Sequence, residues 1–238
     1  PVISSSNGTD EDLVQLIFSS LLKYDADGNL KNDLAESYEI SEDKTLFTFH
    51  LRRDALWHDG QLLTAQDVLF TINLLSDPSY KSPLRYNWQG ITTNLIDDYT
   101  LTFKIENPYV GFLNNLTFGI LPKHIWESIS PDKFTLTDLN LQPIGSGPYK
   151  YASFQKDSTG NIIAYKLTAN PNYFEKKPFI SKITLNFYPD DDSALTAYNQ
   201  KEVMGINSLS PQKLDQIELS KSTQIYRLNI PRYFAVFF

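Results

Sequence analysis

One set of acidic side chains has the composition of a cation site. Asp25, Asp27 and Asn29, with Glu36 eleven residues after Asp25, mimic the ligand spacing of a calcium loop. Such a loop needs glycine at its sixth position, where this chain has Leu30. We therefore interpret the segment as an Asp-Gly turn between a helix and a strand.

Two further segments carry residue types that are often used in chemistry. The acidic run Asp190–Asp192 is explained by a helix start, because the helix dipole favours negative charge there. The glycine-rich segment Gly145–Pro148 fits neither a phosphate loop nor a nucleophile elbow, because its glycine spacing is wrong and a strand follows it. Glycine permits close backbone approach, so we interpret this segment as a backbone crossing between two domains.

The remaining candidates for catalysis or metal binding are few. His50, His58 and His124 are far apart and lack the short spacing of a metal site. The chain has no cysteine, which excludes disulfides, thiolate catalysis and thiolate metal ligands. No set of Ser, His and Asp stands out as a catalytic triad. We predict that the protein is not an enzyme and has no intrinsic metal or organic cofactor.

Composition narrows the class of protein further. The 238 residues suffice for two domains, and 41% apolar with 21% charged residues is typical of globular proteins. The net charge of −7 argues against a nucleic-acid partner and against docking on an anionic membrane. No apolar run approaches the ~20 residues of a membrane helix. The aromatic content of 13% indicates ring-lined surfaces as well as a core.

The two ends of the sequence are unusual. It begins at Pro1, and its only methionine is Met204. The final segment, Tyr233–Phe238, is apolar and aromatic and stops without a polar tail. Because such a run needs a partner to cover it, we expect the sequence to be part of a longer protein.

Apolar spacing and capping residues predict two main helices. The first begins near Thr9 and continues to Leu21, with apolar residues at helical spacing. The second follows Thr64, which forms the pattern of a capping box with Asp67, and ends before Asp77. Shorter helices are expected to begin at Pro122, Asp190 and Pro211.

Alternation of apolar and polar residues predicts several strands. They are Thr45–Arg52, Tyr99–Glu106, two strands joined by a hairpin across Ser158–Asn161, Lys182–Tyr188 and Thr223–Ile230. Residues 76–97, with two prolines, are expected to form a loop. Strands and helices are interspersed throughout, which indicates an α/β or mixed α+β fold.

Five blocks of residues support a more specific interpretation. In chain order they are Leu34–Ser41, Phe47–Arg52 with Trp57–Gly60, Leu63–Val68 with Asp77–Pro78, Pro143–Lys150, and Asn170–Phe174. Together they resemble the extracytoplasmic peptide-binding proteins of ABC importers, the oligopeptide- and dipeptide-binding family (family 5). The resemblance spans essentially the whole chain. Lys201–Met204 departs from it, since the family usually has Gly-Glu-Ile-Asp there.

The resemblance implies a fold and a domain organisation. The fold would be α/β (mixed α+β), a periplasmic-binding-protein type II-like lobe with an inserted smaller α+β domain. Residues 1–34 and 143–238 would belong to the first lobe, which is incomplete and discontinuous. Residues 35–142 would form the inserted domain, and the second lobe would be missing from this chain.

The resemblance also implies a function. The protein would be the substrate-binding component of an ABC importer, which captures peptides by hinge closure and delivers them to the permease subunits in the membrane. It would lie outside the cytoplasm, in the periplasm or on the outer face of the cytoplasmic membrane. Only a lipid anchor outside this chain would attach it to the membrane.

Two alternatives remain open on the residues alone. The same scaffold would bind a non-peptide solute, namely an oligosaccharide, a nickel complex or haem, although the scattered histidines argue against a direct nickel site. In the second alternative the chain belongs to a protein of another class, a non-transport secreted receptor or a hydrolase.

The resemblance places ligand contacts in three segments. The first precedes the first helix and comprises Ser4, Ser5, Ser6, Asn7, Gly8 and Thr9. The second is a loop with Tyr86, Asn87 and Trp88, and the third is a strand with Tyr233, Phe234 and Phe237. Backbone hydrogen bonds hold extended peptides, while aromatic walls form tolerant side-chain pockets. The charged residues that clamp peptide termini are expected mostly in the missing lobe.

Overall fold

The structure is a computed structural model that describes residues 8–109, 111–218 and 223–226. The chain divides into two units. The first is Pro1–Gln155 with Tyr165–Leu185, and the second is Lys156–Ala164 with Asn186–Phe238. The lobe boundaries expected near residues 34 and 143 stay a prediction.

A four-stranded antiparallel sheet forms the core of the first unit, in the order β3-β4-β6-β5. Its strands are β3 (Ala35–Ile40), β4 (Leu46–Leu51), β5 (Ile91–Asp97) and β6 (Thr100–Ile105). In β4 and β6 every second side chain is buried, and Phe47 lies opposite Phe103. The alternation that predicted these two central strands is therefore confirmed.

The expectation of a loop over residues 76–97 is wrong for its last third. Strand β5 pairs with β6 at the edge of the sheet, and most of its side chains are exposed. An edge strand with little burial shows no apolar alternation, which explains why the sequence pattern missed it. The rest of the segment contains two short 3₁₀ helices, η1 (Pro78–Tyr80) and η2 (Pro83–Trp88).

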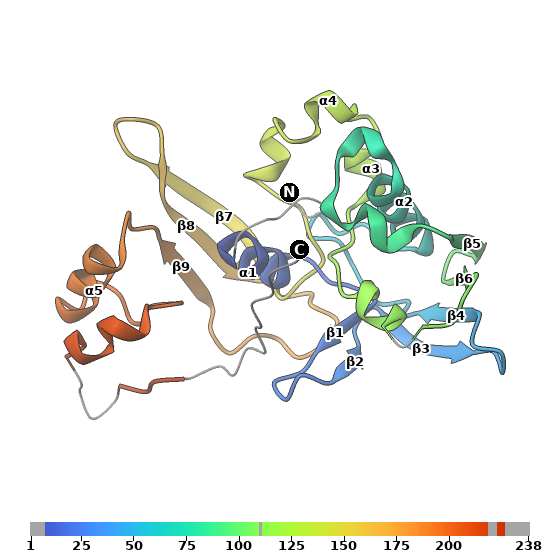
Figure 1. The fold of residues 1–238 in the computed structure, drawn as a ribbon. Coiled ribbons are helices and arrows are strands. Elements are labelled where there is room, and N and C mark those ends of the chain that lie inside the picture. Colours follow the sequence, from blue (N-terminus) through green and yellow to red (C-terminus); the bar gives the residue numbers. More distant parts are fainter. Residues whose placement is uncertain (1–7, 110, 219–222, 227–238) are drawn as a thin grey trace, which may run out of the picture. The chain divides into compact units, whose positions relative to one another are not determined.

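Helix α2 (Ala65–Ser76) begins and ends where the sequence predicts. The Asp67 carboxylate accepts the Thr64 N–H at 2.9 Å, which is one half of the expected capping box. The same buried carboxylate accepts the Lys123 N–H at 2.8 Å, at the start of α3 (Lys123–Trp126). Figure 1 shows α2 and α3 close together on the same side of the sheet, with α4 (Pro131–Phe134) nearby.

Helix α1 (Gly8–Ile17) is shorter than its apolar pattern predicts. It ends at Ile17, and the buried Leu21 lies beyond it, just before the hairpin of β1 (Leu22–Tyr24) and β2 (Leu30–Asn32). The Ile17 carbonyl accepts the Gly147 N–H at 2.8 Å, and the Ser19 N–H donates to Ser146 Oγ at 3.2 Å. These long-range bonds satisfy backbone groups at the helix end.

The segment Gly145–Gly147 lies directly against the end of α1. A Cβ atom on Gly145 would lie 1.9 Å from the Ile17 carbonyl oxygen, and one on Gly147 would lie 2.6 Å from the Ile17 carbonyl carbon. No side chain fits at these distances, so both positions require glycine. The predicted close backbone approach is confirmed, whereas a crossing between two domains at this segment stays a prediction.

His58 holds the other side of this segment. The Gly145 N–H donates to His58 Nδ1 at 3.1 Å, so Nδ1 carries no proton and Nε2–H donates to the Gly147 carbonyl at 3.1 Å. The backbone closes the same contact, because the His58 N–H donates to the Gly145 carbonyl at 2.8 Å. Burial of the ring lowers the pKa of His58 from 6.5 to about 4, which keeps the imidazole neutral.

A three-stranded sheet, β7-β8-β9, contributes residues to both units. Its strands are β7 (Tyr149–Lys156), β8 (Ile162–Ala169) and β9 (Lys182–Asn186). The turn between β7 and β8 has Gly160 at a φ of 91°, and the Asp157 carboxylate accepts two turn N–H groups. The hairpin and the strand that follows it were both predicted.

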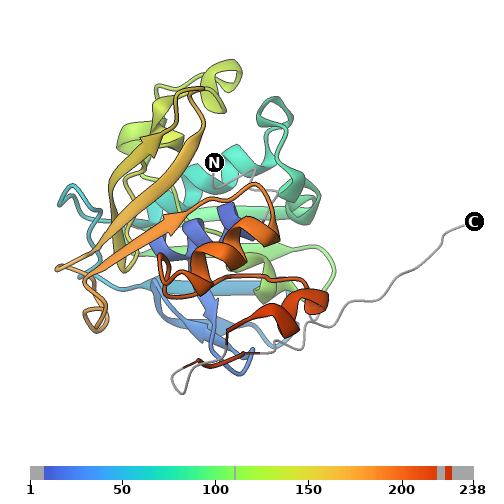
Figure 2. The ribbon, with the colours of Figure 1, turned by 90° about the vertical axis from the view of Figure 1, so that its left-hand side faces the viewer.

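The second unit also contains α5 (Asp191–Asn199) and the 3₁₀ helix η5 (Pro211–Gln216), side by side in Figure 2. Asp190 caps α5 as expected, and Lys213 forms an ion pair with Asp192. Of the strand predicted over Thr223–Ile230, residues 223–226 form no strand and the rest lies outside the described residues. Within the described ranges, no helix combines the length and apolar character needed to cross a membrane.

The packing of Gly145 against Ile17 predicts a severe effect of one added methyl group. Gly145→Ala should lower the free energy of unfolding by roughly 3 kcal/mol, because a backbone oxygen cannot rotate away from the new atom. Gly8→Ala is the control, since its Cβ would meet no atom within 4 Å. Urea unfolding followed by tryptophan fluorescence compares the two variants, and equal stabilities would contradict the packing described.

The neutral state of His58 predicts a pH dependence of stability. Because its pKa is lower in the folded chain than in the unfolded chain, the unfolded state binds more protons between pH 6.5 and pH 4. The free energy of unfolding should therefore fall as the pH falls through this window. Urea unfolding at several pH values should show that His58→Gln loses this part of the slope, whereas His50→Gln keeps it.

Candidate functional site

A pocket of about 210 Å³ lies between α1, η2 and residues 114–119 of the first unit. We call it the α1–η2 pocket. Its lining comes from three segments: Glu11, Val14 and Gln15 of α1; Leu84, Asn87 and Trp88 of η2; and Asn114, Asn115, Thr117, Phe118 and Gly119.

Each wall of the pocket is fixed to the core. The end of α1 is held by the glycine segment described above. Helix η2 begins at Ser82, whose hydroxyl oxygen accepts the Leu84 N–H at 3.2 Å. At its other end Trp88 is only 5% exposed and packs edge-on against Phe118, with 5.4 Å between ring centroids, and against Phe103 of the sheet.

Hydrogen bonds also fix the polar side of the pocket. The Asn115 side-chain nitrogen donates to the Asn87 carbonyl at 3.3 Å and to the Tyr109 hydroxyl at 2.6 Å. The Thr117 hydroxyl donates to the Asn114 carbonyl at 2.9 Å. These bonds use donor hydrogens of the two side chains and orient their oxygens.

The structure places the sequence-predicted ligand residues unevenly. Asn87 and Trp88 line the α1–η2 pocket, whereas Tyr86 is 72% exposed beside it in the same helix. Gly8 and Thr9 are exposed in the first turn of α1, the helix that forms another wall. Ser4, Ser5, Ser6, Asn7, Tyr233, Phe234 and Phe237 lie outside the described residues. Ligand binding by all of these residues stays a prediction.

Sequence reasoning did not name most of the pocket lining. Glu11, Val14 and Gln15 fall at helical spacing inside α1, a pattern that we interpreted only as core and solvent faces. The segment Asn114–Gly119 has neither periodicity nor a turn signal. Only its two adjacent carboxamides, Asn114 and Asn115, mark it as polar.

The two acidic sets that we interpreted as a turn and as a helix start have partners within the protein. Asp25 accepts the N–H groups of Asn29 and Asp27 and pairs with Lys31 at 3.0 Å, which together lower its pKa to about 2. Asp190 accepts the Ser193 N–H at the start of α5. In the described ranges, no group of three or more His, Asp or Glu side chains is placed to hold a metal ion.

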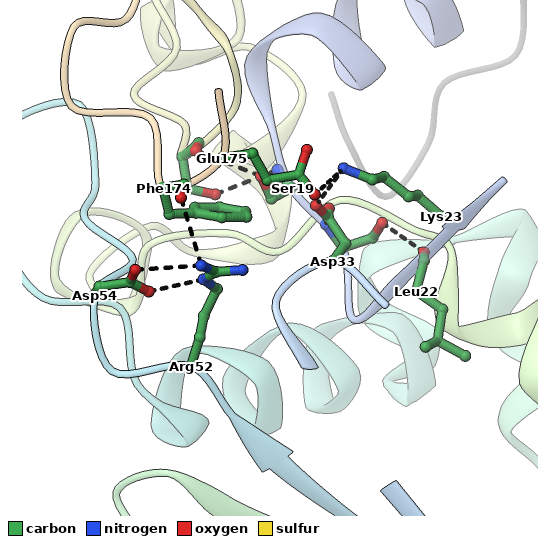
Figure 3. A network of polar contacts seen from close by, with 10 residues as sticks. Ser19, Leu22, Lys23, Asp33, Arg52, Asp54, Phe174 and Glu175 are labelled. Atoms are coloured by element: carbon green, nitrogen blue, oxygen red, sulfur yellow. Dashed lines mark hydrogen bonds and ion pairs between the residues drawn. The ribbon is translucent and has the colours of Figure 1, made fainter. Parts of the chain in front are cut away.

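A second polar cluster, shown in Figure 3, joins the β1–β2 hairpin to the block Asn170–Phe174 and to Glu175, the residue that follows this block. Lys23 pairs with Asp33 at 3.1 Å and with Glu175 at 2.7 Å, and the buried Asp33 also accepts the Ser20 N–H at 3.0 Å. Burial alone would lower the pKa of Lys23, but the two carboxylates outweigh this effect and raise the pKa. The lysine is therefore a charged cross-link between these segments.

Arg52, which directly follows β4, also has hydrogen-bond partners within the protein. Its guanidinium donates to both oxygens of Asp54, at 2.7 and 3.2 Å, and to the Phe174 carbonyl at 3.4 Å. It also lies 4.2 Å from the centroid of the Phe174 ring. Lys23 and Arg52 are therefore both engaged in contacts within the protein.

Comparison with protein families gives a match over most of the chain. Residues 29–238 match the model of the bacterial extracellular solute-binding proteins, family 5 Middle. Among curated relatives, the oligopeptide-binding protein AppA of Bacillus subtilis (strain 168) is 29% identical over 207 residues, which cover 85% of this chain and 37% of that protein.

Solved structures of binding proteins share the fold. AppA from Bacillus subtilis, in complex with a nonapeptide, matches with a TM-score of 0.78 and 28% identity over 85% of this chain and 40% of that one. NikZ from Campylobacter jejuni, in complex with Ni(L-His), matches with a TM-score of 0.76 and 29% identity over 85% of this chain and 39% of that one.

The chain spans about two fifths of the length of these proteins. They are binding proteins and not enzymes, in agreement with the prediction from the residues. Since the family model covers residues 29–238, the chain belongs to the bacterial extracellular solute-binding proteins of family 5.

Proposed function

We propose that the gene product carrying this chain is the substrate-binding component of an ABC importer and that its cargo is a peptide. The observation that carries this proposal is the match to AppA, a protein named for oligopeptide binding and solved with a nonapeptide. The α1–η2 pocket adds a site with apolar rings and carboxamides, the side chains that suit peptide recognition.

The size of the pocket defines its part in binding. Its volume of about 210 Å³ is less than the ~300–1,000 Å³ of a complete ligand site. The pocket therefore suits one side chain of a peptide. Parts of the protein outside this chain would supply the remaining contacts.

From the family match we further propose capture by hinge closure and delivery to permease subunits on the outer side of the membrane. In this proposal residues 1–34 and 143–238 belong to one lobe, and residues 35–142 form the inserted domain. Closure around the peptide would exclude water and strengthen its hydrogen bonds to the protein.

A non-peptide cargo is the second candidate, because NikZ, solved with Ni(L-His), matches this chain almost as well. The contacts of the three histidines argue against their acting as direct ligands of a nickel ion. His58 bonds to the glycine segment, His124 pairs with Asp59 at 2.8 Å, and His50 lies 3.4 Å from the Thr100 hydroxyl.

The identity of the bound cargo tests the proposal directly. We expect the complete gene product, purified under native conditions, to release peptides that mass spectrometry identifies. Calorimetry with those peptides should show saturable binding at one site. Release of only nickel complexes or sugars would favour the second candidate, and no affinity for peptides would contradict the proposal.

The two aromatic side chains of η2 should separate binding from stability. Tyr86→Ala should change the free energy of unfolding by less than about 0.5 kcal/mol, because the ring is exposed, and should weaken peptide binding about tenfold. Trp88→Ala should lower the free energy of unfolding by about 3–5 kcal/mol, because the ring is buried. Peptide affinity that is unchanged in Tyr86→Ala would show that the cargo does not contact the Tyr86 ring.

A further inference from the structure

Several side chains that line the α1–η2 pocket can accept a hydrogen bond from a ligand. The Asn115 side-chain nitrogen has two acceptors of its own, so its Oδ1 atom remains as an acceptor toward a ligand. The Thr117 hydroxyl hydrogen is bonded to the Asn114 carbonyl, which leaves the lone pairs of its oxygen. The carboxamides of Gln15 and Asn114 can offer either their oxygen or their nitrogen.

Glu11 gives the pocket its charge. Among the described residues that line the pocket, Glu11 is the one with an ionisable side chain, and it lies in the first turn of α1. The helix dipole explains why an acidic residue is tolerated there. The Glu11 side chain is exposed, so its carboxylate is open to a ligand.

The apolar part of the lining suits the same kind of ligand. The Trp88 and Phe118 rings meet edge to face in the lining, and Phe118 is the less buried of the two. Aromatic surfaces attract ammonium and guanidinium groups and also cover the apolar stem of a long basic side chain. The size of the pocket, the charge of Glu11, the acceptor oxygens and the aromatic rings therefore favour a long side chain that ends in a cationic group.

We propose that the α1–η2 pocket selects a basic side chain of the cargo, with an ammonium or guanidinium group, and that Glu11 determines this selectivity. The inference rests on the proposed function, since it names the peptide residue that the pocket takes. It goes beyond that function by assigning a charge preference to residues of this chain. A neutral side chain of equal length would leave the exposed Glu11 carboxylate with water alone as its partner.

Calorimetry with the complete gene product and two matched peptides tests the selectivity. Ala-Lys-Ala should bind about tenfold more tightly than Ala-norleucine-Ala, which has the same stem without the charge. Glu11→Gln should remove this difference, whereas Glu39→Gln, an exposed residue of β3 outside the pocket, should keep it. Equal affinities for the two peptides, or a difference that survives Glu11→Gln, would overturn the inference.

A second measurement separates this inference from the proposed function. The complete gene product is labelled with 5-fluorotryptophan, and Trp88→Phe identifies the ¹⁹F signal of Trp88. Methylguanidinium should shift that signal more than neutral methylurea does, and Glu11→Gln should abolish the difference. If no peptide binds but methylguanidinium still shifts Trp88, the proposed function fails and the selectivity of the pocket stands. If the two probes act alike, the selectivity fails whatever the peptides do.

Discussion

The rest of the first unit depends on the contact between the end of α1 and the segment Gly145–Gly147. The two glycines bring one backbone against another at distances that exclude any Cβ atom. The Ile17 carbonyl accepts the Gly147 N–H instead of a bond within the helix. Helix α1 therefore ends at Ile17, and the chain continues toward β1. His58 bonds to the segment from the other side as a neutral imidazole. Helix α1, and with it one wall of the pocket, is thereby fixed to the core.

The sequence blocks that carry the family resemblance meet at this contact and near it. The Asn170 side-chain nitrogen donates to the Gly147 carbonyl at 3.0 Å, and Arg52 reaches the Phe174 carbonyl. These contacts join the blocks to one another, and the Arg52 guanidinium and the Asp59 carboxylate have partners within the protein. The α1–η2 pocket is lined largely by residues outside the blocks, which is expected where one scaffold is adapted to several cargoes.

Local patterns were sufficient for elements whose burial or capping is visible in the sequence. Alternation predicted β4 and β6, and capping residues predicted the starts of α2 and α5. They were insufficient where tertiary contacts decide. The end of α1 is determined by a glycine segment far along the chain, and β5 is held by pairing with β6 despite its exposed side chains. The pocket assembles from three distant segments, so Glu11 and Asn115 could not be paired from sequence alone.

The pocket between α1 and η2 should receive a side chain of the cargo. A crystal structure of the complete gene product with its co-purified ligand tests it most directly. We predict a peptide side chain in the pocket, with its nitrogen within hydrogen-bond distance of the Glu11 carboxylate and of Asn115 Oδ1. A bound cargo that leaves this pocket empty, or a pocket filled by another segment of the same protein, would contradict the account.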